Sequence, residues 1–252
     1  MTQKTAIITG ATRGLGRDMA INLAKDGVDI IFSYNSNEDK AKEVISEIKS
    51  IGQKAIAFHF DANDYKSGQQ FIVNAIDYLK QETGSPNFDF LINNAGTGAF
   101  NLISDTTEKQ FNEMINVHLK SVYFLTQKAL SYINEGGRII NISSGLARFS
   151  LPGMSAYAMM KGGIEVFTRY LAKELGARKI TANVIAPGAI ATDFAGGSNR
   201  DNQEKRNIIA NITALGRVGE AKDIGGTVAF LCSDRASWIN GQRIEVSGGM
   251  LV

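Results

Sequence analysis

Cysteine and histidine are almost absent from this sequence of 252 residues. Cys232 is its one cysteine, and His59 and His118 are its two histidines. A lone cysteine can form neither a disulfide within the chain nor a thiolate zinc cluster, and two histidines do not favour a histidine-rich metal site or a Ser–His hydrolase. We therefore expect no bound metal, an inert Cys232 in an apolar core, and structural or surface positions for both histidines.

The sequence also lacks an excess of charge of either sign and lacks long apolar runs. Its 27 Lys and Arg residues against 25 Asp and Glu residues give a net charge of +2, which points neither to nucleic acid nor to a membrane surface. No apolar run approaches the ~18 residues of a transmembrane helix, and no signal-peptide segment follows Met1. These features predict a cytoplasmic protein, and the 44% of apolar residues suffices for a large core.

Short apolar runs alternate with longer amphipathic segments along the whole chain. This alternation predicts an α/β fold: a doubly wound, Rossmann-like parallel sheet with helices on both faces, in a single domain of residues 1–252. The expected strands are 4–9, 29–33, 54–60, 88–93, 137–143, 180–186 and 243–246. The expected helices are 14–26, 37–51 with Ser36 as its cap, 65–82, a long helix from the cap Thr107 toward 133, 156–178 and 221–233.

A glycine-rich turn joins the first expected strand to the first expected helix. It reads Thr9-Gly10-Ala11-Thr12-Arg13-Gly14-Leu15-Gly16. Glycine lets the backbone approach a pyrophosphate, and the helix N-terminus offers free N–H groups and a positive dipole end. The spacing G-x-x-x-G-x-G differs from the G-x-G-x-x-G fingerprint, so an ordinary loop is the alternative. The strand before the turn and the helix after it favour dinucleotide binding.

Tyr157 and Lys161 lie four residues apart at the start of an expected helix, which places them on one helix face. A phenol has an ordinary pKa of about 10, and a nearby ammonium lowers this pKa by favouring the phenolate. The pair can therefore make Tyr157 a general acid or base near neutral pH. Such pairs also arise by chance, so without the other motifs a solvated helix pair would be the preferred interpretation.

Several motifs occur together in a fixed order. They are the glycine turn, Asn93-Asn94-Ala95-Gly96, Ser144, Tyr157-Ala158-Met159-Met160-Lys161, the segment 182–188 followed by Thr192, and Ser247-Gly248-Gly249. In this order, and with Ser144 thirteen residues before Tyr157, the chain resembles the short-chain dehydrogenase/reductase family over essentially its whole length.

The resemblance implies a catalytic group of Asn116, Ser144, Tyr157 and Lys161. Tyr157 would exchange a proton with the substrate oxygen, which Ser144 would polarise. Lys161 would hold the nicotinamide ribose and lower the Tyr157 pKa, and Asn116 would position a water that links Lys161 to solvent. Two alternatives remain: Asn116 only kinks its helix, or Ser143 takes the place of Ser144.

The resemblance also implies an NADP(H) site. The implied residues are Gly10, Thr12, Arg13, Gly14, Leu15, Gly16, Ser33, Asn35, Asp61, Ala62, Asn93, Ala95, Gly96, Tyr157, Lys161, Pro187, Gly188, Ile190 and Thr192. NADPH is expected over NADH because the second strand is followed by no carboxylate before Glu38, and Arg13 could reach a 2′-phosphate. If Arg13 lies only on the surface, dual specificity is expected. Asp61 and Asn93 could instead be a turn residue and a strand-end residue.

Within the family, segments 215–219, 223–224 and 236–241 most resemble 3-oxoacyl-(acyl-carrier-protein) reductases. This implies reduction of a small-molecule ketone or acyl thioester in fatty acid or polyketide metabolism, with an acyl carrier protein as a possible partner. Glu135 stands where carrier-using members often have basic residues, although Lys173 and Arg178 follow on the next helix. A mobile substrate lid is expected around 191–210, with Gly196 and Gly197 as hinges.

Two other functions stay open. One is an NAD-dependent alcohol or sugar dehydrogenase that works in the oxidative direction, and the other is a non-catalytic dinucleotide-sensing protein. The complete set of expected catalytic residues favours an enzyme. A homotetramer is also expected, because the resemblance implies interfaces through helices 107–133 and 156–178 and the last strand. The two helices carry an apparent apolar surplus at Val122, Phe124, Leu125, Phe167, Tyr170 and Leu171.

Overall fold

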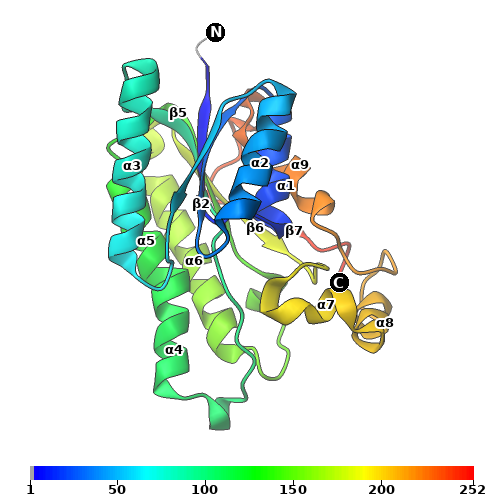
Figure 1. The fold of residues 1–252 in the computed structure, drawn as a ribbon. Helices are drawn as coiled ribbons and strands as arrows, with labels where there is room; N and C mark the ends of the chain where they lie inside the picture. Colours follow the sequence, from blue (N-terminus) through cyan, green and yellow to red (C-terminus); the bar gives the residue numbers. More distant parts are fainter. Residues whose placement is uncertain (1–2) are drawn as a thin grey trace.

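A seven-stranded parallel sheet forms the centre of the molecule (Figure 1). The structure is a computed structural model and describes residues 3–252. The strands are β1 (Thr5–Ile8), β2 (Asp29–Tyr34), β3 (Ala55–His59), β4 (Phe88–Asn93), β5 (Ile133–Ile142), β6 (Thr181–Pro187) and β7 (Arg243–Val246). The α-helices are α1 (Gly14–Lys25), α2 (Glu38–Ile51), α3 (Tyr65–Thr83), α4 (Glu108–Ile115), α5 (Ser121–Ala129), α6 (Ser155–Glu174), α7 (Ser198–Asp201), α8 (Gln203–Asn211) and α9 (Lys222–Cys232).

The strand order is β3-β2-β1-β4-β5-β6-β7, and every pair is parallel. The chain therefore winds outward from β1 in one direction and then outward from β4 in the other. This confirms the doubly wound fold. In such a sheet, the place where the winding reverses opens a crevice at the carboxyl ends of the strands. Here that crevice lies between the ends of β1 and β4.

Two apolar layers cover the two faces of the sheet. Adjacent residues of a strand point to opposite faces, so Ile8 packs with Met19 toward α1, α2 and α9, whereas Ile7 packs with Phe71 toward α3, α5 and α6. Figure 1 shows the two helix groups on the two sides of the sheet. Cys232 is buried in the first layer, where burial raises the pKa of its thiol to about 12.

Several helix boundaries differ from the sequence prediction, and two of the differences have a clear cause, while the expected cap Thr107 is confirmed by a capping box with Gln110. At α2 the cap is Asn37 and not Ser36, because the Asn37 side chain accepts a hydrogen bond from the Lys40 N–H. The long helix ends at Ala129 instead of reaching 133, because residues from Ile133 onward pair with β4 and lengthen β5.

The helix that follows Thr107 is interrupted by a π-helical turn, η2 (Asn116–Lys120), between α4 and α5. A π turn places one extra residue in the helix and changes which side chains face the protein interior. Val117 and His118 are the buried residues of this turn. Such turns are frequent at functional sites, so this one marks a region of interest.

The apolar surplus expected on the two interface helices is smaller than the sequence indicated. Leu125 and Leu171 are 0% and 4% exposed and belong to the core, because they pack in the layer of α3, α5 and α6. Tyr170 is 64% exposed and remains on the surface. Across residues 3–252, we find no helix with the length and apolar character needed to cross a membrane.

Candidate active site

The glycine turn lies between β1 and the N-terminus of α1, at the sheet crevice. Gly10 and Gly14 have φ angles of +70° and +54°, a region that favours glycine. A Cβ atom at Gly16 would collide with the Gly10 carbonyl oxygen, so the helix can approach the strand only without a side chain here. The first turn of α1 contains no acidic residue, which leaves its free N–H groups suited to an anion.

Neighbouring polar side chains hold this turn in place. The Asn94 amide donates hydrogen bonds of 2.9 Å to the Thr9 and Gly10 carbonyl oxygens, and the Thr9 hydroxyl accepts from the Asn94 and Ala95 N–H groups. The Ser33 hydroxyl accepts a 2.9 Å bond from the Gly10 N–H, and Ser33 is only 1% exposed. Ser33, an expected cofactor residue, therefore supports the turn through this hydrogen bond. Asn94 is a positioning residue that the sequence analysis left out of the site.

Other expected cofactor residues meet at the same edge of the sheet. Gly10 lies against Ala95, and Gly14 lies against the Thr192 side chain, so the ends of β1 and β4 and the segment after β6 converge. Ala62 and Asn93 line a narrow internal hollow beside them. Thr12 and Leu15, also expected to bind the cofactor, lie in the glycine turn itself. The other expected cofactor residues lie at or after the carboxyl ends of strands: the exposed Asn35 after β2, Gly96 after β4, Pro187 at the end of β6, and Gly188 and Ile190 after β6.

Two of the expected cofactor residues make internal contacts that match their alternative interpretations. The Asp61 carboxylate accepts a 2.9 Å hydrogen bond from the Asn63 N–H and so forms a local turn. The buried Asn93 amide donates to Thr126 and to Asn141 and links β4 to α5 and β5. The Asn93 side chain therefore lies inside the protein, whereas the Asp61 carboxylate holds a turn after β3.

Arg13 is directed toward the expected lid. Its guanidinium lies 3.3 Å from the Asp193 carboxylate, and its side chain is 61% exposed. Arg200 also binds Asp193 and forms a second ion pair with Asp201 at 2.7 Å. Asp193 thus connects the glycine turn to the segment of α7, and Arg13 stays accessible from the crevice.

Tyr157 and Lys161 are buried at the start of α6, with 7% and 6% exposure, which excludes a solvated helix pair. The Lys161 ammonium donates a 2.7 Å hydrogen bond to the Ile142 carbonyl at the end of β5 and lies 5.5 Å from the centre of the Tyr157 ring. A helix face and a strand end therefore bring the two groups together inside the crevice.

Burial dominates the acid–base behaviour of this pair. It lowers the pKa of Lys161 from 10.5 to about 7, because the charged ammonium loses solvation. Burial also raises the pKa of Tyr157, and the Ser144 hydroxyl opposes this rise in part. The Tyr157 pKa is thus raised, in contrast to the lowering expected from the ammonium, because desolvation is the largest cause. A lysine that titrates near neutral pH can both release and take up a proton.

The two adjacent serines after β5 have different surroundings. Ser143 is 2% exposed, and its hydroxyl donates a 2.7 Å hydrogen bond to the Glu165 carboxylate. Ser144 is half-buried, its oxygen accepts from the Leu146 N–H at 3.2 Å, and its hydroxyl lowers the Tyr157 pKa. The structure therefore brings Ser144, and not Ser143, to the tyrosine.

An ion-pair network supports the Ser144 backbone from β7. The Arg243 guanidinium binds Glu165 and Glu245, each at 2.7 Å, and donates a 3.2 Å bond to the Ser144 carbonyl oxygen. Arg148 binds Glu245 at 2.8 Å from the other side. This network was not predicted from the sequence. Its only signal was the pair of opposite charges two residues apart in the last expected strand.

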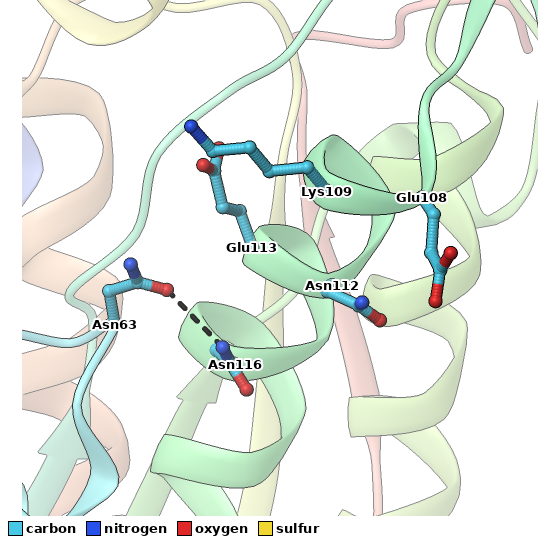
Figure 2. Close-up of a pocket in the computed structure, with 6 residues that line it drawn as sticks. All are labelled: Asn63, Glu108, Lys109, Asn112, Glu113 and Asn116. Atoms are coloured by element: carbon cyan, nitrogen blue, oxygen red, sulfur yellow. Dashed lines mark hydrogen bonds between the residues drawn. The ribbon is translucent and has the colours of Figure 1, made fainter.

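The structure does not bring Asn116 to this group. Its amide points outward into a shallow hollow beside α4 and donates a 3.4 Å hydrogen bond to Asn63 (Figure 2). The buried residue of the same π turn is His118, whose ring meets the Tyr157 ring edge-on with centroids 5.2 Å apart. The extra residue of the π turn directs His118, and not Asn116, toward the crevice. A lone histidine within an apolar helix segment was the available signal.

Comparisons with known proteins agree along the full length of the fold. A family model described as Enoyl-(Acyl carrier protein) reductase matches residues 10–251. The Short chain dehydrogenase/reductase dmxR18 of Cryptosporiopsis sp. is 34% identical over 98% of this chain and 95% of that protein.

Two solved structures have nearly the same backbone. The promiscuous reductase LugOII, described as catalysing keto-reduction at C1 during lugdunomycin biosynthesis, has a TM-score of 0.94 and 37% identity over 100% of this chain and 99% of its own. The angucycline C-6 ketoreductase LanV with bound NADP has a TM-score of 0.93 and 36% identity over 98% of this chain and 95% of its own.

Proposed function

The chain belongs to the short-chain dehydrogenase/reductase family of oxidoreductases, and from this premise we propose that it uses NADPH to reduce a ketone on an apolar ring system to a secondary alcohol. The observation that carries the proposal is the exposed aromatic side chain of Phe194 beside the buried Tyr157 and Lys161 and the half-buried Ser144. LugOII and LanV, which are ketoreductases by description, support the reaction class.

The residues present fit a phosphorylated dinucleotide. The glycine turn and the acid-free N-terminus of α1 would hold its pyrophosphate. Arg13 would bind the 2′-phosphate, since β2 is followed by no carboxylate before Glu38. LanV, which shares the fold at 36% identity, carries NADP. When bound, the reduced nicotinamide supplies the hydride.

The chain's own side chains handle the proton. The Tyr157 hydroxyl donates its proton to the substrate oxygen, and the Ser144 hydroxyl donates a hydrogen bond to the same oxygen. Lys161 titrates near neutral pH and restores the proton to Tyr157. Reduction therefore requires the protonated relay and slows as pH rises above the pKa of Lys161.

Two exposed aromatic side chains, Phe194 beside Tyr157 and Phe100 beside Gly153, support the choice of substrate. The Phe194 ring lies 5.8 Å from the Tyr157 ring and packs against Gly98, while Phe100 packs against Gly153. Phe100 is 72% exposed and Phe194 is 40% exposed. Large exposed apolar side chains at a crevice are typical of a binding surface for apolar ligands, and here they favour a ring-bearing ketone.

A carrier-bound 3-oxoacyl thioester is the second candidate, and its only support from the family model is that the description names an acyl carrier protein, since an enoyl reductase acts on a C=C bond and not on a ketone. The state of the basic residues that were expected to attract an acidic carrier argues against this candidate. The Arg178 guanidinium binds Glu135 at 2.7 Å and donates to the Leu130 and Ile133 carbonyl oxygens. The Glu135 carboxylate therefore offsets the charge of Arg178, which weakens the attraction for an acidic carrier that Arg178 and the exposed Lys173 would provide.

A comparison of substrates tests the proposal. NADPH oxidation is followed with the bicyclic ketone 1-tetralone and with the thioester acetoacetyl-N-acetylcysteamine. We expect kcat/KM to be at least about tenfold higher for the bicyclic ketone, and Phe194→Ala to lower only that value. The exposed Phe230→Ala on α9 is the matched control. A preference for the thioester in the wild type would instead support the second candidate.

A further inference from the structure

Of the two ring nitrogens of His118, one makes a hydrogen bond and the other makes none within the described residues. Its Nε2 lies 2.7 Å from the Thr97 carbonyl oxygen, and a carbonyl can only accept, so Nε2 carries the ring proton. In a neutral ring, Nδ1 is then an acceptor. His118 is 1% exposed, and within residues 3–252 its Nδ1 has no hydrogen-bond partner. Buried polar atoms without a partner are rare in proteins and call for an explanation.

The position of this ring connects it to the catalytic group. The π turn carries His118 to the face of α6 that holds Tyr157 and Lys161, and its ring lies edge-on against the Tyr157 ring with an interplanar angle of 89°. On the other side, a Cβ atom at Gly96 would lie 2.9 Å from the His118 Cε1. Gly96 therefore provides the space in which the imidazole is held.

We propose that His118, and not Asn116, completes the catalytic group: its Nδ1 accepts a hydrogen bond from one water that the Lys161 ammonium also binds, and aligns the proton relay to Tyr157. This assignment rests on the proposed function, in which Lys161 reprotonates Tyr157. His118 acts through Lys161, so it is a positioning residue. It transfers no proton itself.

The electrostatic surroundings keep the imidazole in the form that this role needs. Burial is the main cause that lowers the His118 pKa to about 3, and the nearby Lys161 charge lowers it further. The titratable groups that face the ring are Tyr157 and Lys161 of α6, and the segment after β4 presents only the backbone of Gly96 and Thr97. His118 therefore remains neutral wherever the enzyme would work.

Two substitutions separate the acceptor from the packing of the ring. His118→Phe keeps a buried ring and removes Nδ1, whereas His118→Asn restores an amide acceptor. We expect kcat to fall about 10- to 100-fold in His118→Phe and to stay within about fivefold of wild type in His118→Asn. Without the acceptor the Lys161 ammonium is less stabilised, so in His118→Phe the loss of kcat with rising pH moves to lower pH. The control Asn116→Ala should keep the wild-type rate and pH profile.

A measurement on the free protein needs no turnover. With only two histidines in the sequence, ¹⁵N NMR can assign His118 by comparison with His59→Gln. We expect a neutral ring with its proton on Nε2 from about pH 5 to about pH 9, and a change of the Nδ1 shift when Lys161 is replaced by Met. This readout applies even if a histidine variant is too unstable to assay.

Three results would overturn the proposal. The first is a His118→Phe enzyme with the wild-type rate and pH profile. The second is an equal loss in His118→Phe and His118→Asn, which would indicate packing alone. The third is a charged ring or an Nδ1–H tautomer in the free protein at neutral pH. A wild-type enzyme that reduces no ketone with NADPH would refute the proposed function instead, and the NMR result would still decide whether His118 offers an acceptor.

Discussion

The imidazole of His118 stands edge-on to the phenol ring of Tyr157, with ring centroids 5.2 Å apart and planes at 89°. Edge-to-face contacts of this kind fix the relative orientation of two rings. Both residues are buried, at 1% and 7% exposure, so neither ring can turn without displacing the other. The packing of a histidine that looked structural in the sequence thus sets the orientation of the expected proton donor.

The first prediction concerns acid stability. The pKa of His118 is about 3 in the folded protein against 6.5 for an ordinary histidine, so above pH 6.5 its contribution to the unfolding free energy is complete. As the pH falls from 6.5 toward 3, the unfolded chain takes up a proton that the folded chain excludes, and stability is lost. Urea unfolding of His118→Asn should therefore depend less steeply on pH in this window than wild type. Equal slopes would contradict the assignment of a buried neutral ring.

The second prediction concerns the proton donor. Tyr157→Phe should lower kcat at least about 100-fold, because it removes the hydroxyl that protonates the substrate oxygen. NADPH binding, followed by fluorescence titration, should change little. Tyr170→Phe on the same helix is a matched control, since Tyr170 is 64% exposed. Turnover of Tyr157→Phe close to the wild-type value would rule out the proposed mechanism.

The third prediction concerns cofactor choice. Arg13→Ala should lower kcat/KM for NADPH by about 10- to 100-fold, the value of one charge-assisted hydrogen bond, and leave kcat/KM for NADH nearly unchanged. Arg200→Ala is the control, because Arg200 shares the Asp193 carboxylate with Arg13 but lies on α7. Equal efficiency with both cofactors in the wild type would show that Arg13 does not select the 2′-phosphate.

The fourth prediction concerns the lid at 191–210. The segment folds as short helices, and Ala195, Gly196 and Gly197 all have positive φ angles. We expect its amides to exchange hydrogen faster than those of α6 in the free enzyme, and to become protected when NADPH and a ketone are added together. Mass-spectrometric hydrogen exchange measures both. Full protection without ligand would mean that the segment is a fixed wall and not a lid.

The fifth prediction is a homotetramer. Exposed Tyr123 on α5 and exposed Val166 and Tyr170 on α6 form an apolar surface, and Trp238, shortly before β7, is 98% exposed. Light scattering should give about four times the chain mass of 27.2 kDa, and Tyr170→Arg should reduce the assembly to a smaller species. A wild-type monomer at micromolar concentration would refute the prediction.

The fold could be predicted from the sequence because the patterns that indicate each strand and helix lie within short segments. Apolar runs separated by amphipathic segments placed all seven strands, and β4 and β7 coincide with the predicted 88–93 and 243–246. Tyr157 and Lys161 share one helix turn, so their spacing alone predicted that they lie together. The element boundaries that were not predicted depend on tertiary contacts. β5 extends back to Ile133 because β4 offers it a partner, and no local pattern records this pairing.

The site was harder to predict where side-chain direction depends on packing. Asn116 and His118 are two residues apart, and an extra residue in the π turn decides which one faces inward. Ser33 lies seventeen or more residues after the glycine turn in the sequence, and only its position in β2 brings its hydroxyl to the Gly10 N–H. Neither the π turn nor the inward direction of Ser33 leaves a periodic signal.

The contact between Arg243 and the Ser144 carbonyl oxygen has a consequence for the order of synthesis. The two residues are 99 positions apart, and Arg243 belongs to the last strand. A ribosome-bound chain that has made only β1 to β6 lacks the clamp on the backbone that carries the serine hydroxyl. Because a domain generally folds as a unit, a complete catalytic group forms only after β7 leaves the exit tunnel and docks beside β6.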